Sequence, residues 1–188
     1  MDKKEFFFPS SDGDNRIHAI IWLPDRENYA RPKGIVQIAH GMAEYAGRYE
    51  ELAASLTVRG FLVAGNDHLG HGRSVKSTGD WGHIAGAAGS ACMVNDLHRL
   101  TRILKKRFPN CPYFLLGHSM GSFLARRYLM TYGRELNGAV LLGTGDHGAG
   151  AALAGLLLAE RMKLCRGERF RSELLRNLMF GSYNRRIR

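Results

Sequence analysis

Apolar and polar residues follow two periods along the chain, and these periods predict strands and helices in turn. Short apolar runs bounded by turn residues predict strands, and apolar residues every three or four positions predict helices. Strands are predicted at residues 5–8, 17–23, 34–39, 61–64, 113–116 and 138–142, and helices at residues 49–60, 89–108 and 120–129. Strands that alternate with helices predict a mostly parallel, doubly wound sheet with right-handed crossovers.

The pattern changes after Gly143. Residues 149–159 combine small residues with leucines at helical spacing, and residues 160–179 continue as a basic, helical pattern. We expect two helices inserted over the functional site, and a routine crossover helix that covers the sheet is the alternative. The chain is therefore divided into a sheet-containing part, residues 1–146, and a helical part, residues 147–188.

Composition limits the class of protein. With 188 residues, 45% of them hydrophobic, the chain can bury one core but is short for two full domains. The formal charge is +10, and residues 160–188 alone hold nine Arg or Lys against three Glu. No basic run is interleaved with aromatic residues, so we expect no nucleic-acid partner. A basic stretch beside an apolar helix fits contact with an anionic lipid surface, and equally a solvated face.

Cysteine usage and hydropathy bear on the compartment. Three cysteines without paired spacing fit reduced thiols rather than a disulfide framework. The apolar run near Met1 is too short for a signal peptide, and no apolar run is long enough to cross a bilayer. We therefore expect a cytoplasmic protein.

The most specific chemical signal is Gly117-x-Ser119-x-Gly121, which lies between a predicted strand and a predicted helix. In this setting the pattern is typical of a nucleophile elbow, a sharp turn that presents a serine hydroxyl above the end of a sheet. A serine needs a base to take its proton before it is an effective nucleophile. The alternative is an ordinary turn whose serine only caps the following helix.

A second polar cluster, Asp67-His68-x-x-His71, lies in the glycine-rich loop after the 61–64 strand. Zinc sites need three or four ligands, and this cluster lacks a third clearly spaced one. We expect a hydrogen-bonded loop that packs beside the site, with no metal and no cofactor.

Three segments together resemble a known family. His40-Gly-Met-Ala-Glu44 with Arg48-Tyr49, Asn66-Asp-His-Leu-Gly-His-Gly-Arg-Ser74 and Leu116-Gly-His-Ser-Met-Gly121 resemble the monoacylglycerol lipase and lysophospholipase branch of the α/β-hydrolases, of the serine aminopeptidase S33 type. The resemblance extends over nearly the whole chain. It implies the α/β-hydrolase fold, with residues 1–146 as the N-terminal part of the core and residues 147–188 as a partial lid.

The resemblance also implies roles for individual residues. Ser119 would be the acylated nucleophile, and the main-chain N–H groups of Met42 and Met120 would form the oxyanion hole. His40 would shape the turn that carries Met42 rather than serve as the base. Leucines of the lid segment would line an acyl-chain tunnel or touch lipid; they are Leu153, Leu156 and Leu157.

The acid and the base of this family follow the serine, on loops after later strands. Here His147 is the one histidine after Ser119, and Asp146 precedes it. Adjacent residues rarely serve together, because the base must reach the serine while the acid holds its far nitrogen. We expect instead that the chain is part of a longer hydrolase whose acid, base and last strands lie beyond Arg188. The 138–142 strand would then be an exposed edge, and the chain alone would be poorly soluble and nearly inactive.

The expected function is a serine ester hydrolase that acts on monoacylglycerol or lysophospholipid-type esters through an acyl-enzyme. The elbow does not specify the bond that is cleaved, so a carboxylesterase or an aminopeptidase-like hydrolase is an alternative. A non-catalytic lipid-binding protein, which keeps the pocket but not the triad, is the alternative from another class. The expected partners are a small lipid or ester substrate and, through the basic segment, a lipid interface.

Overall fold

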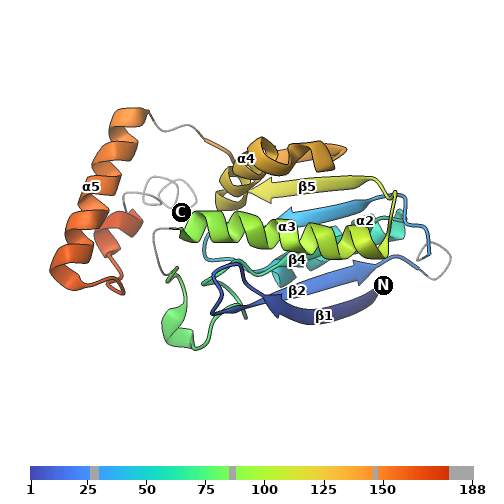
Figure 1. Cartoon of the computed structure of the whole chain (residues 1–188), viewed down its shortest axis with the longest axis horizontal. Helices are drawn as coiled ribbons and strands as arrows, with labels where there is room; N and C mark the ends of the chain where they lie inside the picture. Colours follow the sequence, from blue (N-terminus) through green and yellow to red (C-terminus); the bar gives the residue numbers. More distant parts are fainter. Residues whose placement is uncertain (26–29, 85–87, 146–147, 178–188) are drawn as a thin grey trace. The chain divides into compact units, whose positions relative to one another are not determined.

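The computed structural model describes residues 1–25, 30–84, 88–145 and 148–177. The chain divides into two compact units, Met1–Thr144 and Gly145–Arg188. The first unit holds the six-stranded sheet with the helices that cover it, and the second holds the C-terminal helix α5 (Figure 1).

The elements of the first unit agree with the pattern of apolar positions, and their ends differ from the predicted ends by up to three residues. In chain order they are β1 (Asp2–Pro9), β2 (Arg16–Leu23), β3 (Ile35–Ala39), η1 (Ala46–Tyr49), α2 (Glu50–Val58), β4 (Leu62–Asn66), η2 (Thr78–Asp80), α3 (Gly89–Arg107), β5 (Tyr113–His118), α4 (Met120–Tyr132), η3 (Gly133–Glu135) and β6 (Gly138–Leu142).

The sheet has the strand order β1-β2-β4-β3-β5-β6 (Figure 1). An antiparallel pair, β1 and β2, opens the chain, and β2 pairs antiparallel with β4. The other pairs, β4 with β3, β3 with β5 and β5 with β6, are parallel. The predicted mostly parallel, doubly wound sheet is therefore confirmed. Because β3 and β5 are neighbours, the loops that follow them meet at one edge of the sheet.

Both faces of the central strands are buried, and β2 shows how the sequence achieves this. Its side chains alternate between two cores: Ile17 and Ile21 point to the face covered by α3 and α4, and Ile20 and Trp22 to the face covered by α2. Successive side chains of a strand point to opposite faces, so an unbroken apolar run is what a strand covered on both sides requires. This packing holds the ends of β3 and β5 in fixed positions.

The last strand, β6, pairs only with β5 in the described part of the chain. Val140 and Leu142 are 49% and 46% exposed, although apolar residues dominate this strand. The predicted exposed edge is thus present. An uncovered edge strand of this kind offers unpaired main-chain groups and apolar side chains to another polypeptide.

In the second unit, α5 (Ala149–Arg166) runs without a break through residue 160, where the change from leucines to basic residues predicts a new helix, and a further helical segment occupies residues 173–177. The predicted position of the break was wrong because Glu160, Arg161 and Lys163 are all good helix formers, and a change of charge does not interrupt a helix; the break lies at residues 167–172. The helix ends at Gly167, whose φ of 87° is unfavourable for residues with a side chain.

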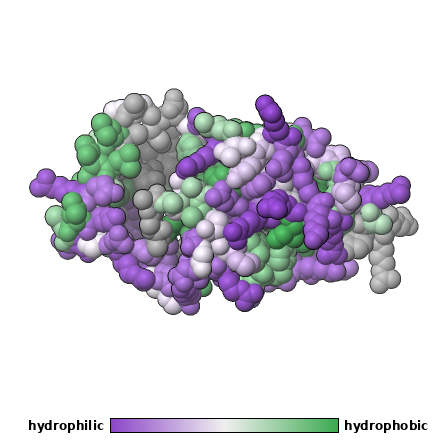
Figure 2. Space-filling model, in the orientation of Figure 1, coloured by the Kyte–Doolittle hydropathy of each residue, from purple (hydrophilic) through white to green (hydrophobic). Residues whose placement is uncertain are grey.

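The surface of α5 carries hydrophobic side chains (Figure 2). Leu153, Leu156 and Leu157 are between 58% and 64% exposed within this unit. Among the described helices, none is long and apolar enough to cross a membrane.

Candidate active site

Ser119 occupies the turn between β5 and α4. Its φ of 51° and ψ of −118° lie in a region that residues with a side chain rarely adopt. Hydrogen bonds hold the main chain there: Ser119 N–H donates to Leu142 O over 2.8 Å, and Ser122 N–H donates to Ser119 O over 2.9 Å. The predicted sequence of strand, sharp turn and helix is present, and the turn is strained in the manner of a nucleophile elbow.

The two glycines of the motif allow this turn to form. A β-carbon at Gly117 would lie 2.5 Å from the main-chain oxygen of Gly121 and 2.9 Å from the Ala125 side chain. A β-carbon at Gly121 would overlap the carbonyl oxygen of Ala39. Only glycine permits both approaches, so the motif brings the start of α4 onto the end of β3.

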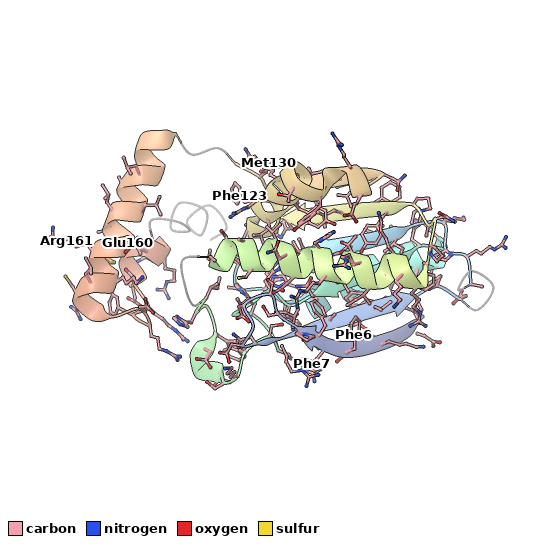
Figure 3. All side chains as sticks on the ribbon, viewed as in Figure 1. Phe6, Phe7, Phe123, Met130, Glu160 and Arg161 are labelled. Carbon is pink, nitrogen blue, oxygen red and sulfur yellow. The ribbon has the colours of Figure 1, made fainter. Side chains whose placement is uncertain are left out.

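The helix after the turn is anchored along one side. Leu124, Ala125 and Tyr128 are buried in the core that α4 shares with α3. Phe123 and Met130 lie on α4 as well but are exposed, by 42% and 88% (Figure 3). Met120 is the first residue of α4, and the first N–H groups of a helix have no acceptor within the helix. That N–H is therefore available to a ligand.

The turn that follows β3 lies directly beside Ser119. A β-carbon at Gly41 would be 3.3 Å from the Cβ of Ser119, although 78 positions of the chain separate the two residues. Met42, the next residue, is 40% exposed. The structure thus brings together three of the residues singled out in the sequence, Met42, Ser119 and Met120, at the ends of β3 and β5.

Glu44 accepts two hydrogen bonds that stabilise this turn. The sequence motifs did not predict this role. Its Oε2 accepts a hydrogen bond from Gly41 N–H over 3.0 Å and another from the Tyr49 hydroxyl over 2.8 Å. Burial alone would raise the pKa of the Glu44 carboxyl, but these hydrogen bonds hold it below its usual value. A carboxylate three residues after a glycine at the end of a strand is the signal that could have revealed this contact.

His118, inside the elbow, contacts the same Glu44 and Tyr49 side chains. Its Nδ1 lies 3.0 Å from the Tyr49 hydroxyl and 3.4 Å from Glu44 Oε2. Burial and the neighbouring Glu44 raise the pKa of Tyr49 above its usual value, so the phenol keeps its proton. The Glu44 carboxylate therefore has a hydroxyl donor on one side and a main-chain donor on the other.

His40 lies at the other side of the turn and is fully buried. Its Nδ1 is 2.7 Å from Gly41 O, and its Nε2 is 2.9 Å from His68 N. Burial lowers the pKa of His40 to about 4, so the imidazole is neutral at pH 7. Burial also lowers the pKa of His68, whose Nε2 lies 3.2 Å from His40 O. The two histidines are thus paired through main-chain groups.

The loop that carries His68 is organised by Asp67. This buried carboxylate accepts hydrogen bonds from Ala46 N–H over 2.7 Å and from Arg73 N–H over 2.8 Å, and it contacts His18 Nδ1 over 2.9 Å. Burial alone would raise the pKa of Asp67, but these contacts lower it. The predicted hydrogen-bonded loop is present. Within the described residues, no group of three or more His, Cys, Asp or Glu side chains is arranged to hold a metal ion.

The structure does not test the remaining candidates. Asp146 and His147 are outside the described residues. Leu153, Leu156 and Leu157 belong to α5 in the second unit. Their assignment to acid, base and acyl-chain contact stays a prediction.

Comparison with known proteins identifies the family of the chain. A family described as "Serine aminopeptidase, S33" (Hydrolase_4) matches residues 30–171 of the chain. A monoacylglycerol lipase of Mycolicibacterium smegmatis is 37% identical over 131 residues, a match that covers 70% of this chain and 43% of that protein.

Two solved structures share the fold. A thermostable carboxyl esterase from Bacillus coagulans is 36% identical, with a TM-score of 0.75 over 86% of this chain and 50% of that one. A lipase in an open form is 29% identical, with a TM-score of 0.81 over 96% of this chain and 57% of that one. The chain therefore spans about half the length of these three proteins.

Proposed function

Because the chain belongs to the serine aminopeptidase S33 family of α/β-hydrolases, we propose that it carries the nucleophile and the oxyanion site of a carboxylic ester hydrolase. The observation that carries the proposal is the strained position of Ser119, with φ at 51° directly before α4 and its Cβ against Gly41. A serine that only capped the helix would have no need of strained backbone, which persists where the surrounding structure over-determines it.

The proposed reaction proceeds through an acyl-enzyme. The Ser119 oxygen attacks the ester carbonyl carbon while a base takes the hydroxyl proton, and the carbonyl oxygen becomes an oxyanion. The N–H groups of Met42 and Met120 donate hydrogen bonds to that oxygen, each worth about 2.7–4 kcal/mol in the transition state. The intermediate then expels the alcohol, which receives the proton from the base. A water molecule attacks the acyl-enzyme in the same way and releases the carboxylic acid.

His40 and His118, the histidines nearest to Ser119 in the two turns, are both held by other groups. His40 has one ring nitrogen on Gly41 O and the other on His68 N–H, and His118 contacts Tyr49 and Glu44. Neither arrangement is that of a base bound to the serine. His147, with Asp146, is the candidate within the chain, and direct chemical labelling of Ser119 decides whether this chain activates its serine.

The proposed substrates are monoacylglycerols or lysophospholipid-type esters. Two observations support this class: the similarity to a protein named monoacylglycerol lipase, and the exposed leucines of α5. Leu153, Leu156 and Leu157 would contact an acyl chain or a lipid interface, where the basic residues near the end of α5 would meet anionic headgroups. A carboxylesterase for smaller esters is the second candidate, favoured by the likeness to the Bacillus coagulans esterase.

The test is labelling with a fluorophosphonate probe, which forms a covalent bond only with an activated serine. If this chain activates its own serine, the probe labels the parent chain and does not label Ser119→Ala. Ser55→Ala, at an exposed serine of α2, is the matched control and should be labelled like the parent. A folded parent chain that resists labelling would contradict the hydrolase proposal for this chain and favour the non-catalytic lipid-binding alternative.

Substrate class then follows from a panel of p-nitrophenyl and glyceryl esters of increasing acyl length. A lipase-like protein should prefer long acyl chains, and Leu156→Ser should reduce that preference without abolishing the hydrolysis of short esters. A preference for short chains in the parent would favour the carboxylesterase alternative.

A further inference from the structure

A cavity of about 330 Å³ shares no residue with the proposed active site. Phe7 of β1 and Arg16 of β2 line it together with Arg73 and Lys76, which belong to the loop after β4. Its volume is at the lower end of the range of about 300–1,000 Å³ that is usual for small-molecule sites. The reaction proposed for Ser119 uses none of these side chains, so the cavity needs an explanation of its own.

The pairing of β1 with β2 sets the first arginine against an aromatic ring. Phe7 lies opposite His18, and Pro9 lies opposite Arg16. Opposite residues share a face of a sheet, and so do residues two positions apart in one strand, so Phe7 and Arg16 project from the same face (Figure 3). The Arg16 Cζ lies 5.3 Å from the centroid of the Phe7 ring. The guanidinium group is thus held at the cavity by an exposed cation–π contact.

The loop after β4 brings a second arginine to the same ring. The Cζ of Arg73 lies 5.4 Å from the Phe7 centroid. The main chain of this loop is fixed, because Arg73 N–H donates to Asp67 Oδ2 over 2.8 Å and the buried Ser74 hydroxyl donates to Asp67 O over 2.7 Å. The Ser74 oxygen also accepts from His18 N–H over 2.9 Å, which fastens the loop to β2.

Positive charge exceeds negative charge around this cavity. The Lys76 ammonium lies 2.5 Å from Asp14 Oδ2, and Arg73 Nη1 lies 2.6 Å from Glu5 Oε2. Within the described residues, the guanidinium group of Arg16 forms no ion pair and no hydrogen bond, and Arg73 uses only Nη1 of its guanidinium nitrogens. An arginine carries five N–H donors, so most of the donors of both groups are available to a ligand.

We propose that this cavity binds a phosphate group, carried by a small organic phosphate or by a phospholipid headgroup, with the side chains of Arg16, Arg73 and Lys76 as its donors. A phosphate monoester carries a charge of about −1.5 to −2 at pH 7, which matches the excess of cations. The planar guanidinium fork meets two phosphate oxygens with parallel N–H groups. Because the Phe7 ring already holds both guanidinium groups, little side-chain freedom is lost on binding.

Calorimetric titration of the full chain with glycerol 3-phosphate, at about pH 7.5 and constant ionic strength, tests the site directly. The parent chain should bind one equivalent, and Arg16→Gln should bind about 10-fold or more weakly, because a charged hydrogen-bond donor is lost. Arg102→Gln is the matched control and should bind like the parent: Arg102 is an exposed arginine of α3, which covers the opposite face of the sheet.

Two further variants separate a built site from general attraction between charges. Asp14→Asn removes the carboxylate that competes for Lys76, so glycerol 3-phosphate should bind about 2- to 5-fold more tightly. Phe7→Leu leaves the net charge unchanged but releases both guanidinium groups, so binding should weaken. Equal affinities in Arg16→Gln and Arg102→Gln, or the same heats with sodium chloride alone, would overturn binding of a soluble phosphate. Ser119→Ala should bind like the parent, which keeps this test independent of the hydrolase proposal.

Vesicles distinguish the two sources of the phosphate group. Phosphatidylcholine vesicles with and without phosphatidic acid are sedimented with the parent chain, with Arg16→Gln and with Arg102→Gln. Loss of binding to phosphatidic acid in Arg16→Gln alone, without binding of glycerol 3-phosphate by the parent, would identify a lipid headgroup as the ligand. Glycerol 3-phosphate binding that depends on Arg16, with equal sedimentation of the three proteins, would identify a soluble phosphate. If residue 16 affects neither assay, the proposal is wrong.

Discussion

Gly121 lies so close to Ala39 that a β-carbon at residue 121 would overlap the carbonyl oxygen of Ala39. The same β-carbon would be 2.6 Å from His40 O. The first turn of α4 therefore rests on the main chain that leads into the Gly41 turn. The proposed nucleophile and the proposed oxyanion donor lie far apart in the sequence. This main-chain contact, rather than a contact between side chains, holds them close together.

This contact predicts that Gly121→Ala is strongly destabilising. The added methyl group cannot be accommodated unless α4 moves away from β3, and such overpacking typically costs about 1–3 kcal/mol or more. The free energy of unfolding in urea measures the loss. Gly133→Ala is the matched control, because Gly133 has a helical φ of −59° and its β-carbon would meet Leu129 at an ordinary 3.6 Å. A Gly121→Ala protein as stable as the Gly133→Ala protein would show that the helix and the strand are not in contact as described.

The strain at Ser119 leads to a second prediction. Because φ is 51° at this residue, any side chain there is unfavourable, and Ser119→Gly should be more stable than Ser119→Ala by about 1 kcal/mol. Both variants lack the hydroxyl, so the comparison isolates the backbone term from any loss of hydrogen bonding. Thermal or urea unfolding of the pair measures it. Equal stability of the two proteins would mean that the elbow stores no strain.

The elbow could be predicted from the sequence because its information is local. Two glycines flank one serine, and the apolar run before them and the helical spacing after them lie within a few residues. The alternation of strands and helices is local in the same sense, since a strand covered on both faces must be an unbroken apolar run. Local patterns of this kind also misplaced one boundary: the change of charge near residue 160 suggests the start of a new helix, whereas α5 continues to Arg166 and the next helical segment starts at residue 173.

The contacts that organise the site could not be predicted in this way. His40 and His68 are separated by 28 positions, and Glu44 and His118 by 74, so only the pairing of β3 with its neighbours brings them together. The spacing of His68 to His71 does not predict the contact that His68 makes with His40. In the structure the main-chain N–H of His68 is the donor, and the residue type does not reveal such a role.

A polar network between the sheet and α3 gives a third prediction. Gln37 is fully buried on β3; its Oε1 accepts from the Tyr113 hydroxyl and from Thr101 Oγ1, and its Nε2 donates to Leu97 O. Gln37→Leu leaves a buried hydroxyl without its acceptor, which should cost about 1–3 kcal/mol. Tyr113→Phe removes that hydroxyl as well, so the double variant should lose less stability than the two single variants together.

A double-mutant cycle in urea measures this coupling. We expect an interaction energy of about 0.5–3 kcal/mol between residues 37 and 113, as for other groups in one hydrogen-bond network. Strictly additive losses would indicate that the Tyr113 hydroxyl finds another partner when Gln37 is absent.

The buried histidines give a fourth prediction, on the dependence of stability on pH. Burial lowers the pKa of His40 from 6.5 to about 4, and burial lowers the pKa of both His68 and His71 as well. Between pH 6.5 and pH 4 the unfolded chain therefore binds protons that the folded chain does not. The free energy of unfolding must fall as the pH decreases through this range, and His40 alone would account for about 3 kcal/mol over the whole range.

The carboxylates beside these histidines affect stability in a lower pH range. The contribution of the histidines can therefore be measured separately. Asp67 and Glu44 have lowered pKa values, so their contribution persists above their unfolded values of 3.8 and 4.5 and is lost only as the pH falls below them. Unfolding free energies measured between about pH 7.5 and pH 5 thus report the histidines. His40→Asn removes one titrating group, so its stability should vary less steeply with pH than that of the parent chain. If the two slopes coincide, the His40 imidazole accepts a proton as readily in the folded chain as in the unfolded one, and its burial between Gly41 and His68 is not what the hydrogen bonds indicate.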